Sequence, residues 1–305
     1  MTGTTRDFAG KTAFITGGVN GIGFGIARAF AMAGMDLILT YRKEQDREDA
    51  ARWLAENGLP PARFVRLDVT DRAAFAQAAT EAGKVHVLVN NAGVSVFGPT
   101  DEASYDDHDW IMSVNYGGVV NGIVSFLPGM KAHGEGGHVV NVASMAAYLS
   151  GPQAGIYTAS KFAVRGLTEC LRYNLAPHGI GVSLMCPGLT RTNAWTSALK
   201  RPEAFAESGF APADPVELEQ FGTAFELGMD PLEVGQKTLA GMIANDGLIF
   251  THGEFAEDFE EIYHTSLAAL PKEEIPEVRL HIEALRRAGN KAAAQGRKIG
   301  LGDLT

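Results

Sequence analysis

The sequence predicts an α/β protein built on one doubly wound parallel sheet. Along its 305 residues, short continuous apolar runs alternate with longer amphipathic segments. Strands that are apolar throughout are typical of a parallel sheet with helices packed on both faces. A glycine-rich turn between the first apolar run and the first helical segment is a second sign of such a fold. We therefore expect a single domain over residues 1–305.

Seven apolar runs are the candidate strands. They cover residues 12–16, 37–41, 63–67, 86–90, 138–142, 181–186 and 247–251. Helix-like segments lie between them, for example at residues 21–34, 44–58, 71–83, 156–176 and 231–245. This alternation predicts a Rossmann-type sheet of seven parallel strands.

Residues 188–230 depart from the alternation and read as an irregular, proline-rich insertion. Its aromatic residues are Trp195, Phe205, Phe210, Phe221 and Phe225. A long loop with so many rings is typical of a lid that covers a substrate site. The alternative is that the rings pack on the body of the protein or at a subunit contact.

Residues 254–305 form a C-terminal extension beyond the last candidate strand. Within it, Val278, Ile282 and Leu285 mark one apolar stripe on a helix. The stripe predicts that the extension docks on the body of the protein.

The composition argues against several classes of protein. The formal net charge is −10 and no lysine and arginine cluster could follow a phosphate backbone, so nucleic acid is not an expected partner. The sequence contains no uninterrupted apolar run of about 18 residues, which would predict a membrane span. It also contains no N-terminal apolar run, which would predict a signal peptide. Cys170 and Cys186 lie far apart in apolar surroundings, which disfavours a disulfide framework and favours a cytoplasmic location.

The best candidate for a metal site is the run Asp106, Asp107, His108 and Asp109. Acidic residues in the first turn of a helix are stabilised by the helix dipole without any ion. Carboxylates alone also choose poorly among metals. We therefore expect no metal.

The glycine-rich turn "TGGVNGIG" follows the first candidate strand and opens the first helix. Gly17, Gly21 and Gly23 would let the backbone turn tightly and approach a pyrophosphate, whose charge the helix N-terminus stabilises. The turn therefore predicts a dinucleotide cofactor.

The end of the second candidate strand bears on which dinucleotide binds. NAD-binding proteins normally carry a carboxylate there for the ribose hydroxyls, but this chain has Tyr41, followed by Arg42 and Lys43. A guanidinium holds a 2′-phosphate well. We expect NADP to be preferred over NAD, the alternative being that Arg42 and Lys43 only solvate the next helix.

Tyr157 and Lys161 stand four positions apart in a helix-like segment, so their side chains share one face of the helix. An ammonium about 4 Å from a phenol at an effective dielectric near 20 would lower the phenol pKa by roughly three units. This pattern predicts a tyrosine acidic enough to act as a base. On its own, the pair also fits a part-buried tyrosine and a solvated surface lysine.

With these motifs in order, the sequence resembles the short-chain dehydrogenase/reductase superfamily over about residues 11–251. The resemblance rests on "TGGVNGIG", "LDVTD", "NNAG", "SVNYGG", "NVAS", the Tyr157 and Lys161 pair, and "PGLTRT". It implies that the catalytic residues are Asn115, Ser144, Tyr157 and Lys161. The cofactor-binding residues it implies, together with the two expectations above, are Gly17, Asn20, Gly21, Ile22, Gly23, Tyr41, Arg42, Asp68, Val69, Asn91, Ala92, Gly93, Tyr157, Lys161, Pro187, Gly188, Thr190 and Thr192.

A closer resemblance, over most of the chain, is to bacterial Cα-dehydrogenases that oxidise the benzylic alcohol of lignin-derived β-aryl ether dimers. It implies a bulky aromatic alcohol or ketone as substrate. Those relatives carry an acidic residue at the position of Tyr41 and use NAD, so this chain departs from them there. Alternatives are a steroid, terpenoid or acyl ketone substrate, or a non-catalytic NADP-sensing protein. The superfamily also implies a homodimer or homotetramer, formed by helices near residues 116–130 and 156–176.

Overall fold

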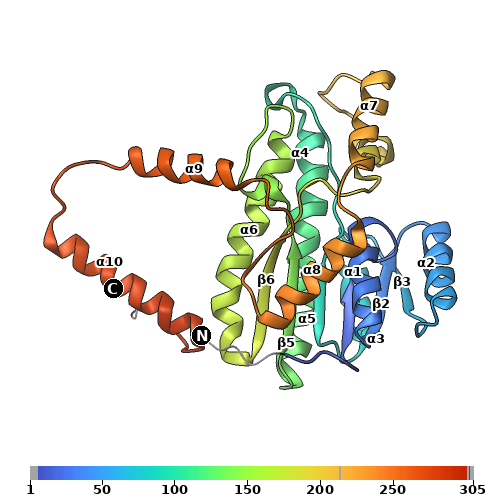
Figure 1. Cartoon of the computed structure of the whole chain (residues 1–305), viewed down its shortest axis with the longest axis horizontal. Helices are drawn as coiled ribbons and strands as arrows, with labels where there is room; N and C mark the ends of the chain where they lie inside the picture. The colour runs from blue at the N-terminus through green and yellow to red at the C-terminus, as the bar shows by residue number, and fades with distance from the viewer. Residues whose placement is uncertain (1–5, 213, 301, 303–305) are drawn as a thin grey trace.

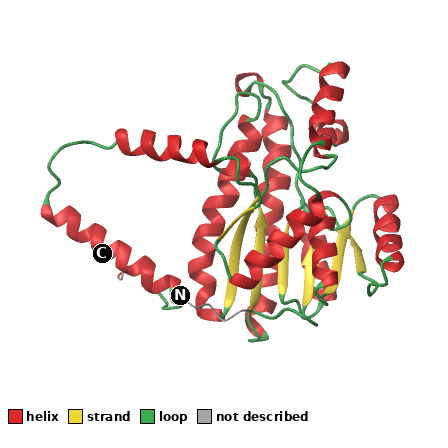
Figure 2. Ribbon diagram, in the orientation of Figure 1, coloured by secondary structure: helices red, strands yellow, loops and turns green. Residues whose placement is uncertain are grey.

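The core of the protein is a parallel sheet of seven strands in the order β3-β2-β1-β4-β5-β6-β7. The computed structural model describes residues 6–212, 214–300 and 302. Its strands are β1 (Thr12–Ile15), β2 (Asp36–Tyr41), β3 (Arg63–Arg66), β4 (Val87–Asn90), β5 (Gly137–Val142), β6 (Ile180–Cys186) and β7 (Leu248–Phe250). Each adjacent pair is parallel, which confirms the predicted Rossmann-type sheet (Figure 2).

Helices cover both faces of the sheet (Figure 1). One face is covered by α1 (Gly21–Met32), α2 (Glu44–Glu56) and α8 (Pro231–Ala244). The other is covered by α3 (Arg72–Ala82), α4 (Tyr105–Met112), α5 (Gly118–Ala132) and α6 (Gly155–Leu175).

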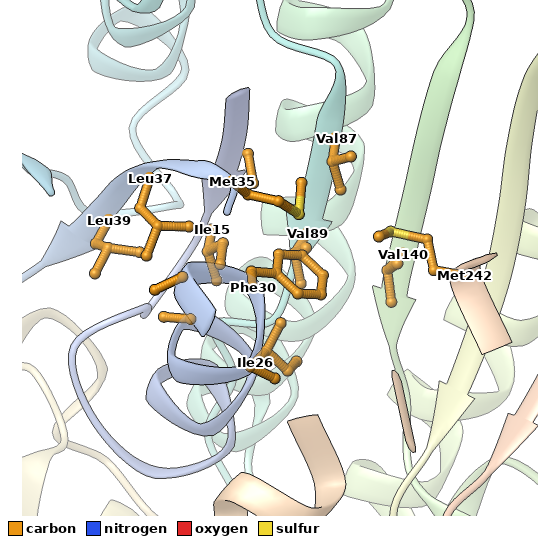
Figure 3. Packing of buried hydrophobic residues seen from close by; sticks show 14 of the residues in the cluster. Ile15, Ile26, Phe30, Met35, Leu37, Leu39, Val87, Val89, Val140 and Met242 are labelled. Carbon is orange, nitrogen blue, oxygen red and sulfur yellow. The ribbon is translucent and has the colours of Figure 1, made fainter. Parts of the chain in front are cut away.

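The core under the first face lies between the sheet and two touching helices. Figure 3 shows Ile26 and Phe30 of α1 in one cluster with apolar strand residues such as Val89. α1 and α8 approach so closely that a Cβ on Gly235 would lie 2.1 Å from the carbonyl oxygen of Gly25. Glycine is therefore required where these two helices cross.

The chain reverses its direction of winding between β1 and β4. These strands are neighbours, with Ile15 beside Val89, although β2 and β3 intervene in the sequence. Ligands of such sheets bind at the carboxyl ends of the strands beside this reversal. The segments that follow β1 and β4 are therefore the expected walls of a cofactor site.

One helical stretch is long and apolar enough to cross a membrane by length and composition alone, Tyr105–Ala132. More than half of its apolar window is buried inside the protein. It contributes Trp110, Ile111 and Phe126 to the core under the second face. Burial of this kind is typical of a core helix.

Two predictions about the irregular segments are wrong. The insertion at residues 188–230 contains a regular helix, α7 (Pro215–Glu226), which begins with the side chain of Asp214 capping Val216 N–H at 2.7 Å and with a proline at its first position. The stripe of Val278, Ile282 and Leu285 is not covered by the body, since these side chains are 64%, 48% and 37% exposed, and only the end of their helix packs against α6. They belong to α10 (Glu277–Ala294), which follows α9 (Ala256–Ala268) in an extension that stands away from the sheet (Figure 1).

Candidate active site

Tyr157 lies in the first turn of α6 and Lys161 in the second, next to the carboxyl end of β5. Lys161 is only 4% exposed, and its Nζ donates a hydrogen bond of 3.3 Å to the carbonyl oxygen of Val142. The same Nζ lies 5.5 Å from the centre of the Tyr157 ring. The predicted face-sharing of the pair is therefore present in the helix.

Ser144 reaches the same place from the loop after β5. Its backbone is fully extended, and its Oγ accepts the N–H of Ala146 at 3.1 Å, which starts the short helix η3 (Met145–Ala147). The hydroxyl is close enough to Tyr157 to lower the pKa of that phenol. Three of the four predicted catalytic side chains thus meet at one edge of the sheet.

The direction of the Tyr157 pKa shift differs from the expectation that Lys161 would lower it. Burial raises the pKa of Tyr157 above its usual value, and the Ser144 hydroxyl offsets this only in part. Burial also lowers the pKa of Lys161 to about 8. Burial is the largest cause of both shifts, because removal from water disfavours the charged phenolate as well as the charged ammonium.

Asn115 is buried where the α4–α5 helix widens into one π turn, η2 (Ser113–Gly117). Its amide oxygen accepts the N–H of Val94 at 2.8 Å. Its amide nitrogen donates to the carbonyl oxygen of Val94 and to Ser160 Oγ, both at 3.0 Å. The side chain is therefore committed to α6 and to the loop after β4, and it does not bond Lys161.

The glycine turn has the shape that a pyrophosphate requires. Gly17 and Gly21 have φ of +60° and +50°, and a Cβ on Gly23 would lie 2.2 Å from the carbonyl oxygen of Gly17. The side chain of Asn20 does not cap α1; it donates instead to Asp46 at 2.8 Å. With no acidic residue in the first turn, the N–H groups of α1 suit an anion. Ile22 packs this turn on the core.

The segment after β4 supports the glycine turn. Asn91 Nδ2 donates to the carbonyl oxygens of Thr16 and Gly17 at 2.9 and 3.3 Å. The N–H groups of Asn91 and Ala92 both bond Thr16 Oγ1. A Cβ on Gly93 would lie 3.1 Å from Asn115 Oδ1 and 3.6 Å from Lys161 Nζ. This segment therefore connects the glycine turn, which is the predicted cofactor cradle, to the predicted catalytic groups.

The outer end of the cradle carries Tyr41, which is partly buried, and Arg42. The Arg42 guanidinium lies 3.8 Å from the carboxylate of Asp68, and both side chains are about half exposed. An exposed pair of this kind contributes little free energy. Arg42 can therefore turn toward a phosphate at small cost. Val69 is buried, and its carbonyl oxygen accepts Asn121 Nδ2 at 2.8 Å.

The loop after β6 contains a feature that the sequence did not reveal. His252 Nδ1 accepts the N–H of Gly188 at 3.0 Å, and its Nε2 donates to the carbonyl oxygen of Leu189 at 2.9 Å. A Cβ on Gly188 would lie 2.8 Å from the His252 ring. His252 lies two residues after the last strand, so only the sheet order brings it to this loop.

The rest of this loop crosses in front of the glycine turn. Pro187 accepts the N–H of Met145 at 2.9 Å through its carbonyl oxygen. Thr190 is buried and bonds the carbonyl oxygen of Gly188 at 3.1 Å, so its hydroxyl serves the loop itself. Thr192 Cγ2 lies 3.4 Å from the position of a Cβ on Gly21. Thr192 is therefore the residue of this loop that reaches the cradle.

The aromatic residues of the insertion divide into two groups. Phe221 of α7 lies 5.1 Å from Phe97 and 5.2 Å from Phe225, edge to face, and Phe97 lies 6.3 Å from the Tyr157 ring. Phe97, Phe221 and Phe225 thus form a row of rings, the aromatic wall, that begins beside Tyr157. Phe205 and Phe210 instead pack on the core under the second face, and Trp195 packs on Gly222 of α7. Phe205 and Phe210 thus follow the alternative in which the rings pack on the body, and a lid role for the insertion stays a prediction.

The acidic run at residues 106–109 holds the insertion in place. Asp107 is fully buried and forms an ion pair with Arg201, and it also accepts the N–H groups of Ser104 and Gly209, each at 2.9 Å. These hydrogen bonds lower the pKa of Asp107 to about 2, against the opposing effect of burial. Among the described residues, no group of three or more His, Cys, Asp or Glu side chains is arranged to hold a metal.

Known proteins resemble this chain over most of its length. Residues 11–203 match the family model described as short chain dehydrogenase. C alpha-dehydrogenase of Sphingobium sp. (strain NBRC 103272 / SYK-6) is 34% identical, covering 97% of this chain and 99% of that protein. A structure from Novosphingobium aromaticivorans solved as a short-chain dehydrogenase has a TM-score of 0.80 at 36% identity, covering 95% and 100% of the two chains. A short chain dehydrogenase/reductase from Burkholderia phymatum in complex with NAD has a TM-score of 0.80 at 33% identity, covering 89% and 99%.

Proposed function

The chain belongs to the short-chain dehydrogenase family, and on this premise we propose that it transfers a hydride between a nicotinamide cofactor and a bulky aromatic, benzylic secondary alcohol or its ketone. The observation that carries the proposal is the convergence of Tyr157, Lys161 and Ser144 beside a glycine turn shaped for a pyrophosphate.

Tyr157 is the proposed general base in alcohol oxidation and the general acid in ketone reduction. Its hydroxyl would take the alcohol proton as the carbon–hydrogen bond breaks, which needs a base whose pKa is near the working pH. When bound, the oxidised dinucleotide accepts the hydride, and its positive ring favours the phenolate. Ser144 would hydrogen-bond the substrate oxygen and fix its distance from Tyr157.

Lys161 and Asn115 have supporting roles in this proposal. The Lys161 ammonium favours the phenolate of Tyr157, and the bond to Val142 holds it in place. Because both amide ends of the Asn115 side chain are occupied, a water next to Lys161 would be held by the Asn115 backbone in the π turn. That water would lead the proton to solvent.

The aromatic wall next to Tyr157 supports an aromatic substrate. Edge-to-face ring contacts such as those of Phe97, Phe221 and Phe225 extend favourably to one more ring. The Sphingobium relative is a C alpha-dehydrogenase, which agrees with a benzylic alcohol of a lignin-derived dimer. A steroid, terpenoid or acyl ketone is the second candidate, because the same apolar wall would accept it. A purely cofactor-sensing role is disfavoured, since it needs neither Tyr157 nor Lys161.

NADP is the cofactor we propose, with NAD as the alternative. Arg42 at the outer end of the cradle is half exposed and only weakly paired, so it suits a 2′-phosphate. The Burkholderia relative was solved with NAD, which is the reason for testing both dinucleotides. We further propose a homo-oligomer in the cytoplasm, where Cys170 and Cys186 would stay reduced.

A matrix of NAD⁺ and NADP⁺ against benzylic alcohols, β-aryl ether dimers, steroids and terpenoid alcohols tests these proposals, with reduced cofactor followed by absorbance. We expect turnover of the benzylic alcohols, lost at least a hundredfold in Tyr157→Phe while cofactor binding persists. A flat response for every benzylic alcohol would exclude the aromatic substrate. Turnover of Tyr157→Phe near the wild-type rate would exclude the mechanism.

A further inference from the structure

The C-terminal arm, defined as α9 (Ala256–Ala268), residues 269–276 and α10 (Glu277–Ala294), leaves the body after β7 and returns near the end of α6 (Figure 1). Both helices extend away from the body, and residues 269–276 join their ends that lie farthest from it (Figures 1 and 2). The arm is therefore fixed to the body at its two ends only.

The apolar stripe of α9 begins on the body and continues past it. At the root of the arm, the Phe259 ring lies 5.1 Å from Tyr148 and 5.3 Å from Phe250, edge to face. At helical spacing from Phe259, the same stripe continues with side chains that are 39% to 60% exposed. They are Ile262, Tyr263, Leu267 and Leu270.

The stripe of α10 shows the same arrangement in reverse. Gly289 and Ala293 are buried where the end of α10 packs against α6. Counting back by three and four residues, the same face carries Leu285, Ile282 and Val278, which are 37%, 48% and 64% exposed. Each helix thus carries an apolar face that its own body covers only at one end.

The two helices also carry opposite charge. α9 has four carboxylates, on Glu257, Asp258, Glu260 and Glu261, and no lysine or arginine. α10 has four basic residues, Arg279, Arg286, Arg287 and Lys291, against the two carboxylates of Glu277 and Glu283. An α9 helix would therefore pack on an α10 helix with matched apolar faces and complementary charge.

We propose that two copies of the chain associate through their arms, with α9 of each copy lying on α10 of the other. A twofold axis makes such a contact reciprocal, so that both stripes of both copies are covered at once. Within one chain, α9 and α10 lie apart and are joined through residues 269–276, so they do not cover each other's stripes (Figure 2).

The area of the stripes is sufficient for this association. Seven stripe side chains are about half exposed, and a large apolar side chain offers roughly 150 Å². Two copies would therefore bury about 1,000 Å² of apolar surface from these residues alone, which is the lower limit for a specific interface. Each copy exposes about half of this area, divided between the stripes of its two helices.

Light scattering after size exclusion tests the association at micromolar concentration. The wild type is expected at twice the chain mass of 32.4 kDa, or at a multiple of it. Leu267→Glu and Ile282→Glu place a charge in each stripe and should halve the mass. Ala284→Glu puts the same charge on the opposite, exposed face of α10 and should leave the mass unchanged. A monomeric wild type, stripe variants of unchanged mass, or equal loss in Ala284→Glu would each overturn the proposal.

Cross-linking identifies which helices meet, independently of whether a charged variant folds. In a Cys170→Ser background, which removes the exposed native thiol, a tagged Leu267→Cys chain is mixed with an untagged Ile282→Cys chain and treated with a bismaleimide. A product joining tagged to untagged chains is expected. Cross-links only between identical chains, or only within a chain carrying both cysteines, would overturn the pairing of α9 with α10.

Discussion

Lys161 Nζ lies 5.5 Å from the centre of the Tyr157 ring, in a site where Lys161 is buried and Tyr157 is partly buried. Burial raises the pKa of Tyr157 and lowers that of Lys161 to about 8, so each group resists the charge that catalysis requires of it. The two charges, once formed, stabilise each other. Burial therefore costs folding free energy here, and the cost is greatest for the lysine.

Replacing this lysine should stabilise the fold while removing activity. The unfolded chain keeps the Lys161 proton between about pH 8 and pH 10.5, where the folded chain has lost it, so stability of the wild type rises with pH across this window. Lys161→Met should therefore gain roughly 1–3 kcal/mol at pH 7, and the gain should vanish near pH 10.5. Urea unfolding at both pH values measures it. The control Lys237→Met, on a half-exposed lysine, should show no gain in unfolding free energy. A gain in Lys161→Met that did not depend on pH would contradict the lowered pKa of Lys161.

Truncation of the aromatic wall should weaken binding of aromatic substrates. Phe97→Ala and Phe221→Ala each remove an edge-to-face contact worth about 0.5–1.5 kcal/mol beyond its area. KM for a benzylic alcohol should rise about tenfold in each, with a smaller change in kcat. Steady-state kinetics with a small aliphatic alcohol should show little effect. Tyr105→Ala, which removes a ring that is 90% exposed, serves as control. An equal rise in KM in this variant would show that the rings of Phe97 and Phe221 do not bind the substrate.

Arg42 should decide the preference for NADP. A hydrogen bond to a charged group contributes about 1.5–3 kcal/mol, so Arg42→Ala should weaken NADP binding by tenfold or more and leave NAD binding nearly unchanged. Tyr41→Asp should reverse the preference toward NAD. Calorimetric titration of both dinucleotides checks this, with Arg52→Ala on the exposed face of α2 as control. Equal losses for both dinucleotides in Arg42→Ala would show that no 2′-phosphate is bound there.

His252 should act as a positioning residue for the loop at residues 187–192. His252→Ala leaves the N–H of Gly188 without its partner, at about 1–3 kcal/mol for a buried group, and removes one of the two partners of the Leu189 carbonyl oxygen, which still accepts the N–H of Met229. KM for the cofactor should rise several-fold, while kcat at saturation changes less. His252→Asn restores an acceptor near Gly188 and should recover part of the loss. A fall in kcat alone, with no recovery in His252→Asn, would point to a different role.

The Asp107 and Arg201 pair should anchor the insertion. Removing one partner of a buried pair costs about 3–5 kcal/mol, so Asp107→Ala should melt several degrees lower, whereas Asp109→Asn at an exposed position should not. The pKa of Asp107 is lowered to about 2, so the stability it contributes is present above pH 4 and is lost as the pH falls toward 2. Thermal melts should be unaffected by EDTA; a fall in melting temperature with EDTA would reinstate a metal at this run.

Local sequence patterns were sufficient for the strands and for most helices. The apolar runs predicted all seven strands within about two residues, because inner strands such as β4 and β6 are buried along their whole length and are therefore mostly apolar. The glycine turn was also predictable, since only glycine tolerates the φ of Gly17 and the contact at Gly23. The α7 helix was missed because the proline at its first position and its exposed polar residues resemble a loop.

Only the tertiary structure decided how residues remote in sequence act on one another. The contact of His252 with Gly188 depends on β6 and β7 being neighbours, and the burial that raises the pKa of Tyr157 depends on which elements cover it. The arm shows the same limit: the stripe of Val278, Ile282 and Leu285 is apolar in sequence, yet the body does not cover it. Sequence periodicity fixes which side chains share a face, whereas burial depends on what the rest of the molecule places against that face.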